Sequence, residues 1–163
     1  MTRSGLFLCV LLWCLPSANA SEGADALFAA TLTGLDGQAA PLSVWKGVPL
    51  MVNFWARWCA PCRQEIPAIG KLRARHHAEG LEVIGIAIED DAEAVRDFVR
   101  AYEMSYPVFV AKEKSTALMR ALGNGRALLP FTVFIDRQGQ MVGRKLGPLN
   151  GAELDAAAQR LLP

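Results

Sequence analysis

Residues 49–62 read PLMVNFWARWCAPC, and this stretch decides the fold. Its first six residues form an apolar run that only Asn53 interrupts, which predicts a central strand buried on both faces. Cys59 and Cys62 follow at the point where a helix is expected to begin, and Pro67 is expected to kink that helix. The stretch therefore predicts a buried strand that leads directly to a C-x-x-C pair at a helix N-terminus.

Strand and helix patterns alternate along the rest of the chain. The expected elements are a loose polar start at 21–26, strands at 27–33 and near 41–42 around a turn at 34–37, a helical turn at 43–47, a helix from the cysteines to about 79, a strand at 81–88, a helix at 92–102, a strand at 107–110, a helix at 115–122, a hairpin with strands at 131–135 and 140–146, and a helix at 151–162. This order predicts one α/β domain over residues 21–163, with a mixed central sheet flanked by helices and an extra N-terminal β-hairpin.

Length and composition are those of one globular domain. The chain has 163 residues, of which 52% are hydrophobic and 20% charged, and this is enough to build one core. The net charge is +1, and the sequence has no basic block of the kind that binds nucleic acid. We therefore expect no nucleic-acid partner.

The first twenty residues have the pattern of a cleavable signal peptide. Arg3 supplies a positive charge, residues 6–15 are apolar, Pro16 ends the run, and residues 18–20 read Ala-Asn-Ala, a signal-peptidase pattern. The apolar run is shorter than the roughly 20 residues that span a bilayer core. We expect cleavage after Ala20, with an uncleaved N-terminal membrane anchor as the alternative that leaves the domain on the same side of the membrane.

Cleavage would leave two of the four cysteines, Cys59 and Cys62, in the mature chain. A secreted domain with a single C-x-x-C pair has no disulfide framework, so the pair is expected to carry chemistry. A structural zinc site would need a second pair of ligands, which the mature chain does not supply as cysteines, and we expect no metal. An inert structural disulfide is the other alternative, although so short a loop would constrain the unfolded chain little.

The predicted position of the pair favours thiol–disulfide exchange. A helix N-terminus presents unpaired N–H groups and about half a positive charge, and both stabilise a thiolate. The pKa of Cys59 would therefore be lowered, making it the attacking nucleophile. Cys62, one turn further into the helix, would resolve the mixed disulfide.

Residues 53–67, NFWARWCAPCRQEIP, and residues 129–136, LPFTVFID, resemble the TlpA/ResA/CcmG(DsbE)-like family of thioredoxin-fold oxidoreductases. The resemblance extends over residues 27–162. It implies a thioredoxin-like fold, a redox-active disulfide without a further cofactor, and export to the periplasm. It also implies that Cys59 is the exposed nucleophile and Cys62 the resolving cysteine.

The resemblance also assigns supporting residues around the pair. Pro130 matches a cis-proline that faces the cysteines and leaves backbone groups of Leu129 available to a substrate strand, the alternative being an ordinary trans proline. Trp58 matches an aromatic residue that covers the site and contacts partners, the alternative being packing against a strand edge.

Acidic residues offer candidates for proton transfer. Cytoplasmic thioredoxins carry a buried aspartate where this chain has Asn53, which cannot act as a base. Glu89 or Asp90 matches an acidic residue of the family that lies near the cysteines, where it would raise the thiol pKa and shuttle the proton. The alternative is a solvated loop that caps the next helix. Glu65 is expected in the first turn of the helix that begins at the cysteines, where an acid favours the helix dipole. A capping role there and a catalytic role are both open.

The direction of exchange follows from residues 60 and 61, which place alanine and proline between the cysteines. No cation stabilises the thiolate there, so a strongly oxidising couple is not favoured. Thioredoxin and the oxidant DsbA differ by about 150 mV, or roughly 7 kcal/mol. We expect a protein-disulfide reductase, with two alternatives: a periplasmic disulfide oxidase or isomerase, and a non-enzymatic chaperone that binds copper through Cys59 and Cys62.

Partners are implied by the resemblance alone. Its members take electrons from a membrane thiol transporter of the DsbD or CcdA kind. They pass these electrons to protein disulfides, such as the haem-attachment cysteines of apocytochrome c in cytochrome c biogenesis, or copper chaperones in oxidase assembly. We expect a periplasmic monomer that acts on protein disulfides.

Overall fold

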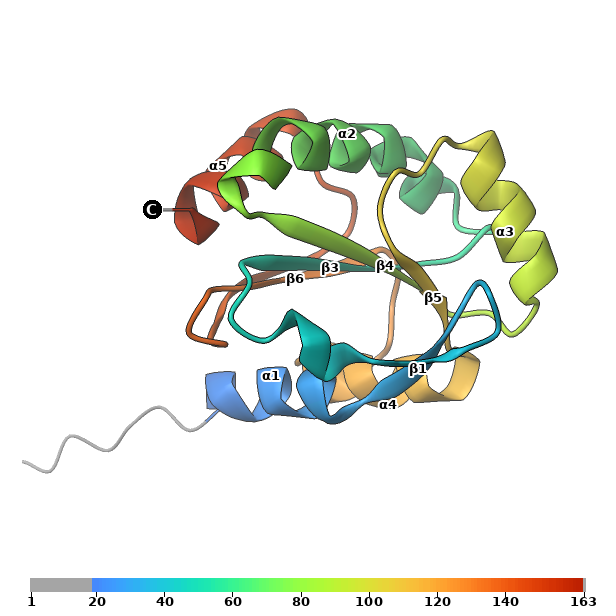
Figure 1. Cartoon of the computed structure of the whole chain (residues 1–163), viewed down its shortest axis with the longest axis horizontal. Coiled ribbons are helices and arrows are strands. Elements are labelled where there is room, and N and C mark those ends of the chain that lie inside the picture. Colours follow the sequence, from blue (N-terminus) through green and yellow to red (C-terminus); the bar gives the residue numbers. More distant parts are fainter. Residues whose placement is uncertain (1–18, 163) are drawn as a thin grey trace, which may run out of the picture.

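The computed structural model describes residues 19–162, which form a seven-stranded mixed sheet with helices on both faces (Figure 1). The strands are β1 (Thr31–Gly34), β2 (Ala39–Pro41), β3 (Leu50–Trp55), β4 (Glu82–Ala87), β5 (Val108–Val110), β6 (Phe131–Ile135) and β7 (Met141–Leu146). The helices are α1 (Asn19–Ala29), α2 (Ala60–His76), α3 (Ala92–Ala101), α4 (Lys112–Ala121) and α5 (Gly151–Leu161), with 3-10 turns η1 (Leu42–Trp45) and η2 (His77–Glu79). The strand order is β2-β1-β5-β4-β3-β6-β7.

Strand β3 lies inside the sheet, as the apolar run predicted. All six of its residues are buried, and it pairs in parallel with β4 and antiparallel with β6. A parallel pair needs a long crossover, which α2 provides. The α/β class and the mixed sheet are therefore confirmed. Strand β3 ends shortly before the start of α2.

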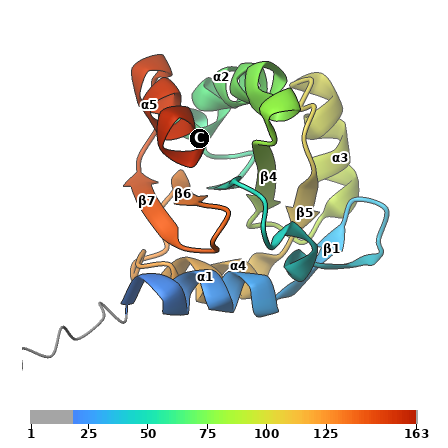
Figure 2. The ribbon, with the colours of Figure 1, turned by 60° about the vertical axis from the view of Figure 1, so that its left-hand side comes forward.

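Helices cover both faces of the sheet (Figure 2), and a core of buried side chains lies on each face. Because successive side chains of a strand point to opposite faces, Met51 and Trp55 join the core beneath α2, α3 and α5. Val52 and Phe54 join the core that α1 and α4 cover. Asn53, which shares the face of Met51 and Trp55, is thereby placed under α2.

The N-terminal part differs from the prediction. Residues 21–26, expected as a loose start, belong to α1, and the strand expected over 27–33 begins only at Thr31. Ala24, Leu27 and Phe28 are all buried, and their spacing of three and four residues forms one helical face that packs on the sheet with α4. The N-terminal hairpin itself is confirmed, because β1 pairs with β2 and also with β5.

Three further predictions concern the signal peptide and the bounds of two helices. The predicted signal peptide, residues 1–20, lies outside the described residues except for its last two, so it stays a prediction. Helix α4 begins at Lys112, three residues before the expected 115. Helix α2 contains Pro67 and continues into η2. Gly80 follows η2 as its cap residue, with a left-handed φ of 95°.

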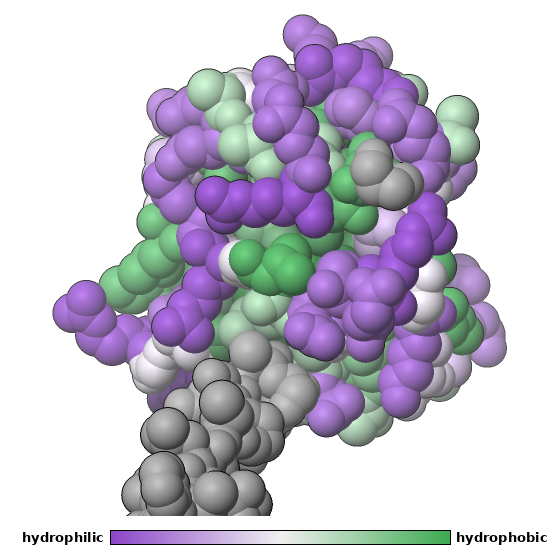
Figure 3. Space-filling view, turned by 90° about the vertical axis from the view of Figure 1, so that its left-hand side faces the viewer, coloured by the Kyte–Doolittle hydropathy of each residue, from purple (hydrophilic) through white to green (hydrophobic). Residues whose placement is uncertain are grey.

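Figure 3 shows the end of the molecule at which α2 ends, far from the start of that helix. Hydrophilic side chains cover most of this end, and hydrophobic ones gather in a small area in its middle. Within residues 19–162, none of the helices combines the length and the apolar character that crossing a membrane requires.

Helix α5 depends on the cap at its start, and this gives a test of the fold. The Asn150 side chain accepts a hydrogen bond from the Glu153 N–H at 3.0 Å, and the Asn150 N–H donates to Glu153 Oε2 at 3.0 Å. Replacing Asn150 by alanine should lower the free energy of unfolding by about 1 kcal/mol, measured by urea denaturation. Asp155→Ala is the control, because it removes an exposed ion pair with Arg75, worth about 0.5 kcal/mol. Equal losses in the two variants would contradict this account of the cap.

Candidate active site

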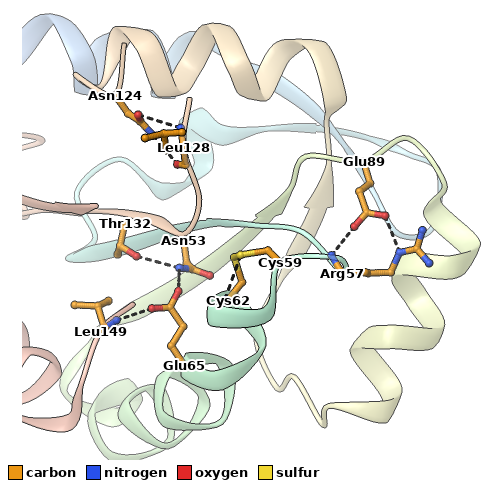
Figure 4. The surroundings of a disulfide bond; sticks show 10 residues. All are labelled: Asn53, Arg57, Cys59, Cys62, Glu65, Glu89, Asn124, Leu128, Thr132 and Leu149. Atoms are coloured by element: carbon orange, nitrogen blue, oxygen red, sulfur yellow. Dashed lines mark hydrogen bonds and ion pairs between the residues drawn. A yellow bond between two sulfur atoms is a disulfide. The ribbon is translucent and has the colours of Figure 1, made fainter. Parts of the chain in front are cut away.

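Cys59 lies between the end of β3 and the start of α2, and Cys62 lies in the first turn of α2. The two cysteines form a disulfide (Figure 4). Their Cα atoms are 5.3 Å apart, and Cys59 is the N-cap residue of α2. The Cys62 N–H donates a hydrogen bond to Cys59 Sγ at 3.3 Å. Pro61, in the first turn, removes no needed donor because that N–H would have no partner in the helix. The predicted placement of the pair at a helix N-terminus is confirmed.

The two sulfur-bearing residues differ in access to solvent. Cys62 is fully buried, and Cys59, expected to be the exposed nucleophile, is 6% exposed. Trp58 beside it is 69% exposed, which contradicts the alternative of an aromatic packed against a strand edge. Both cysteines are therefore buried, and the small remaining exposure of the pair lies at Cys59, beside a large exposed indole.

A buried polar network lies next to Cys62 (Figure 4). Asn53 Nδ2 donates to Glu65 Oε1 at 2.8 Å and to Thr132 Oγ1 at 3.0 Å, and the Leu149 N–H donates to Glu65 Oε2 at 2.7 Å. Glu65 is 2% exposed. The expectation that Glu65 occupies the first turn of α2 is wrong: that turn holds no acidic residue, and Glu65 is a buried carboxylate of the site.

The sequence did hold a signal for this position. Residues three apart on a helix lie on the same face, so Glu65 was bound to lie beside Cys62 once α2 was placed. Burial raises the pKa of the Glu65 carboxyl from 4.5 to about 6, although hydrogen bonds from Leu149 and Asn53 act in the opposite direction. Near neutral pH the site therefore holds a buried negative charge next to Cys62 (Figure 4).

Glu89 supports the loop that precedes the cysteines. The Arg57 N–H donates to Glu89 Oε1 at 2.6 Å, and Arg57 Nε donates to Oε2 at 2.7 Å. Glu89 is 8% exposed and points to Arg57 (Figure 4), so it is not part of a solvated loop. Asp91 is the residue that caps α3, by accepting from the Ala94 N–H. Proton transfer through Glu89 or Asp90 stays a prediction.

The loop before β6 brings the predicted proline into place. The Leu129–Pro130 peptide bond is cis, as the resemblance implied, and Pro130 is buried. Asn124 Nδ2 donates to the Leu128 carbonyl at 2.8 Å, and Asn124 Oδ1 accepts from the Leu128 N–H at 3.2 Å. This two-point clamp was not predicted, because Asn124 and Leu128 fall between the helix expected at 115–122 and the strand expected at 131–135, where no element was expected.

Within residues 19–162, no group of three or more His, Cys, Asp or Glu side chains is arranged to hold a metal ion.

Comparison with known proteins places these features in a family. The model of the Redoxin family matches residues 21–161. The chain is 30% identical to the thiol–disulfide oxidoreductase ResA of Bacillus cereus, over 81% of this chain and 74% of that protein. It is also 30% identical to the thioredoxin-like protein YneN of Bacillus subtilis, over 77% of this chain and 72% of that protein.

Solved structures are similar to this chain over most of its length. The structure of MTB DsbF has a TM-score of 0.72 at 25% identity, covering 83% of this chain and 97% of that one. A thiol:disulfide interchange protein of the thioredoxin family from Chlorobium tepidum has a TM-score of 0.69 at 29% identity, covering 82% and 93%. The thioredoxin-like fold predicted from the sequence is confirmed.

The buried carboxylate predicts how stability depends on pH. Because the pKa of Glu65 is higher in the folded chain than its ordinary value of 4.5, the folded chain holds this proton more tightly. The contribution of Glu65 to stability is therefore lost as pH rises from about 4.5 to about 6, by about 2 kcal/mol in all. Urea denaturation between about pH 4 and 7 should show the wild type losing this much stability relative to Glu65→Gln. A difference between the two proteins that does not vary with pH would refute the assignment.

Proposed function

We propose that this chain, which belongs to the Redoxin family and is a thiol–disulfide oxidoreductase, reduces protein disulfides in the periplasm through Cys59 and Cys62. The comparisons show the family and the exchange chemistry. The direction of electron flow, the roles of the two cysteines, the compartment and the partners are the proposal.

The observation that carries the direction is the Glu65 carboxylate, buried three residues beyond Cys62. When ionised, it repels a nearby thiolate and raises the pKa of the thiol. Reduced pairs are stabilised by thiolate formation, and strong oxidants such as DsbA gain their high potential in this way. A buried anion removes part of that stabilisation, so it favours the disulfide and makes the dithiol a better reductant. The lack of a cation at positions 60 and 61 acts in the same direction.

The proposed exchange moves two electrons in two steps. The Cys59 thiolate attacks a substrate disulfide and forms a mixed disulfide, releasing one substrate thiolate. Cys62 then loses its proton, attacks Cys59 Sγ, and expels the second substrate thiolate. The substrate disulfide is reduced as the Cys59–Cys62 disulfide forms. Glu65 is placed to accept the Cys62 proton, because it is the buried base on the same helix face.

The difference in burial between Cys59 and Cys62 supports these separate roles. Cys59 has the remaining exposure and the N–H of Cys62 directed at its sulfur, which suits the attacking residue. Trp58 and Leu128, 69% and 43% exposed, offer apolar contact to a protein substrate. The Leu129 backbone before Pro130 is the proposed pairing edge for an extended substrate segment.

Compartment and partners complete the proposal. A signal peptide over residues 1–20 would deliver the chain to the periplasm, where disulfides persist. A reductase there needs electrons from the membrane, so we propose a thiol transporter of the DsbD or CcdA kind as donor. Protein disulfides of cytochrome c or oxidase assembly would be the substrates, and the chain would act as a monomer.

The reduction potential of the Cys59–Cys62 couple tests the direction. Equilibration of the mature chain with a dithiol buffer should give a value near or below that of thioredoxin, about −270 mV. Glu65→Gln should give a higher potential, because the reduced pair is then no longer opposed by the carboxylate. A value near −120 mV, as for DsbA, would make the chain an oxidant or isomerase instead.

Single-cysteine variants test the two roles. Cys59→Ser should lose exchange with a disulfide substrate altogether. Cys62→Ser should still attack, and should accumulate as a mixed disulfide because no resolving thiol remains. Non-reducing electrophoresis and mass spectrometry of each variant, incubated with a disulfide-containing peptide, make the comparison. Mixed disulfides formed by Cys59→Ser rather than by Cys62→Ser would reverse the assigned roles.

A further inference from the structure

Three buried polar atoms beneath α2 lack a protein hydrogen-bond partner within residues 19–162: Asn53 Oδ1, Trp55 Nε1 and Tyr106 Oη. Asn53 and Trp55 are fully buried, and Tyr106 is 5% exposed. Unpaired polar atoms cost free energy in a protein interior, so nearly all of them find a protein or water partner. Three such atoms in one region need a common explanation.

Two of these side chains meet over one point of the sheet, at Gly85, and the third lies beside that point on the neighbouring strand. A Cβ atom built on Gly85 would lie 2.9 Å from Trp55 Nε1 and 3.2 Å from Tyr106 Cε2. Asn53 is the register partner of Gly85 on the neighbouring strand. Because Gly85 has no side chain, the indole N–H and the phenol reach in over the backbone between β3 and β5.

The unpaired atoms are chemically complementary through water. Trp55 Nε1 can only donate, Asn53 Oδ1 can only accept, and the Tyr106 hydroxyl can do both. A water molecule donates two hydrogen bonds and accepts two, and buried waters in proteins make about three. One water bonded to all three atoms would satisfy these groups, which have no direct hydrogen bonds to one another.

We propose that Asn53, Trp55 and Tyr106 bind a buried water molecule over Gly85, and that Tyr106, through this water, fixes the orientation of the Asn53 amide that holds Glu65. The water is a structural ligand of the site. Tyr106 is a positioning residue, because it acts on Glu65 through the water and Asn53.

The hydrogen bonds of Asn53 explain the consequence. Both protons of its Nδ2 are used, one toward Glu65 Oε1 and one toward Thr132 Oγ1. A water that donates to Oδ1 keeps the amide in this orientation, with its donors on the carboxylate. Tyr106 lies within electrostatic reach of Glu65: burial is the larger cause that raises the pKa of its hydroxyl, and the Glu65 charge adds to it.

Tyrosine variants test the proposal, and the chain contains two tyrosines. Tyr106→Phe removes the hydroxyl that would bind the water. Tyr102→Phe is the matched control, because Tyr102 is half-buried and stacks on Phe98 with ring centroids 4.1 Å apart. We expect Tyr106→Phe to lower the equilibrium constant for folding about fivefold, as loss of one satisfied hydrogen bond does, and Tyr102→Phe to change it less. If the hydroxyl were unpaired, Tyr106→Phe would be as stable as the wild type or more so, and the proposal would fall.

The titration of Glu65, followed by NMR of its carboxyl carbon, distinguishes a positioning role of Tyr106 from an effect on the stability of the fold alone. Lys145 and Glu153 also act on this carboxyl, from β7 and α5, and both remain in the variant. We expect the pKa of Glu65 to rise further in Tyr106→Phe, because the Asn53 donor is held less firmly, and to stay unchanged in Tyr102→Phe. An unchanged value in Tyr106→Phe would overturn the positioning role.

The water itself can be observed in the unmodified protein. A high-resolution crystal structure should show an ordered water bonded to at least two of the three atoms. A dry site would overturn the proposal whatever the variants do.

Discussion

The burial of the Glu65 carboxylate is the constraint on which the site is built. A buried charge is tolerated only when hydrogen-bond donors replace its water. The donors here come from Asn53 on β3 and from the backbone of Leu149 just before α5. One side chain of α2 thereby fixes the central strand, the helix of the cysteines and the C-terminal helix relative to one another, with Cys62 beside the point where they meet.

Two further polar contacts hold the loops that surround the disulfide. Glu89 binds the backbone and side chain of Arg57, two residues before Cys59. Asn124 binds both backbone groups of Leu128, two residues before Pro130. In each case a single side chain replaces the hydrogen bonds that a regular strand would make. The loops stay ordered while their exposed side chains remain free to meet a partner.

Local sequence patterns predicted the elements whose structure depends on residues that are close together in the sequence. The run before the cysteines predicted β3, because a strand buried on both faces is apolar throughout, and the cysteine spacing placed the pair at the start of α2. Helix α1 was missed, since residues 21–26 are small and polar and residues 27–33 alternate roughly as a strand does. The position of Glu65 was within reach, but its partner Leu149 lies 84 residues away. No local pattern could supply that contact, nor the meeting of Tyr106 with Trp55 over Gly85.

The buried acid links the stability of the fold to its chemistry. Ionised Glu65 makes the folded chain less stable than its protonated form does, since burial raises its pKa to about 6. The same negative charge opposes a thiolate at Cys62 and so strengthens the dithiol as a reductant. An amide at this position would remove both effects together. Retaining a carboxylate in the interior therefore costs stability near neutral pH. The proposed reductase, which must also deprotonate the buried Cys62, would have a chemical reason to keep it.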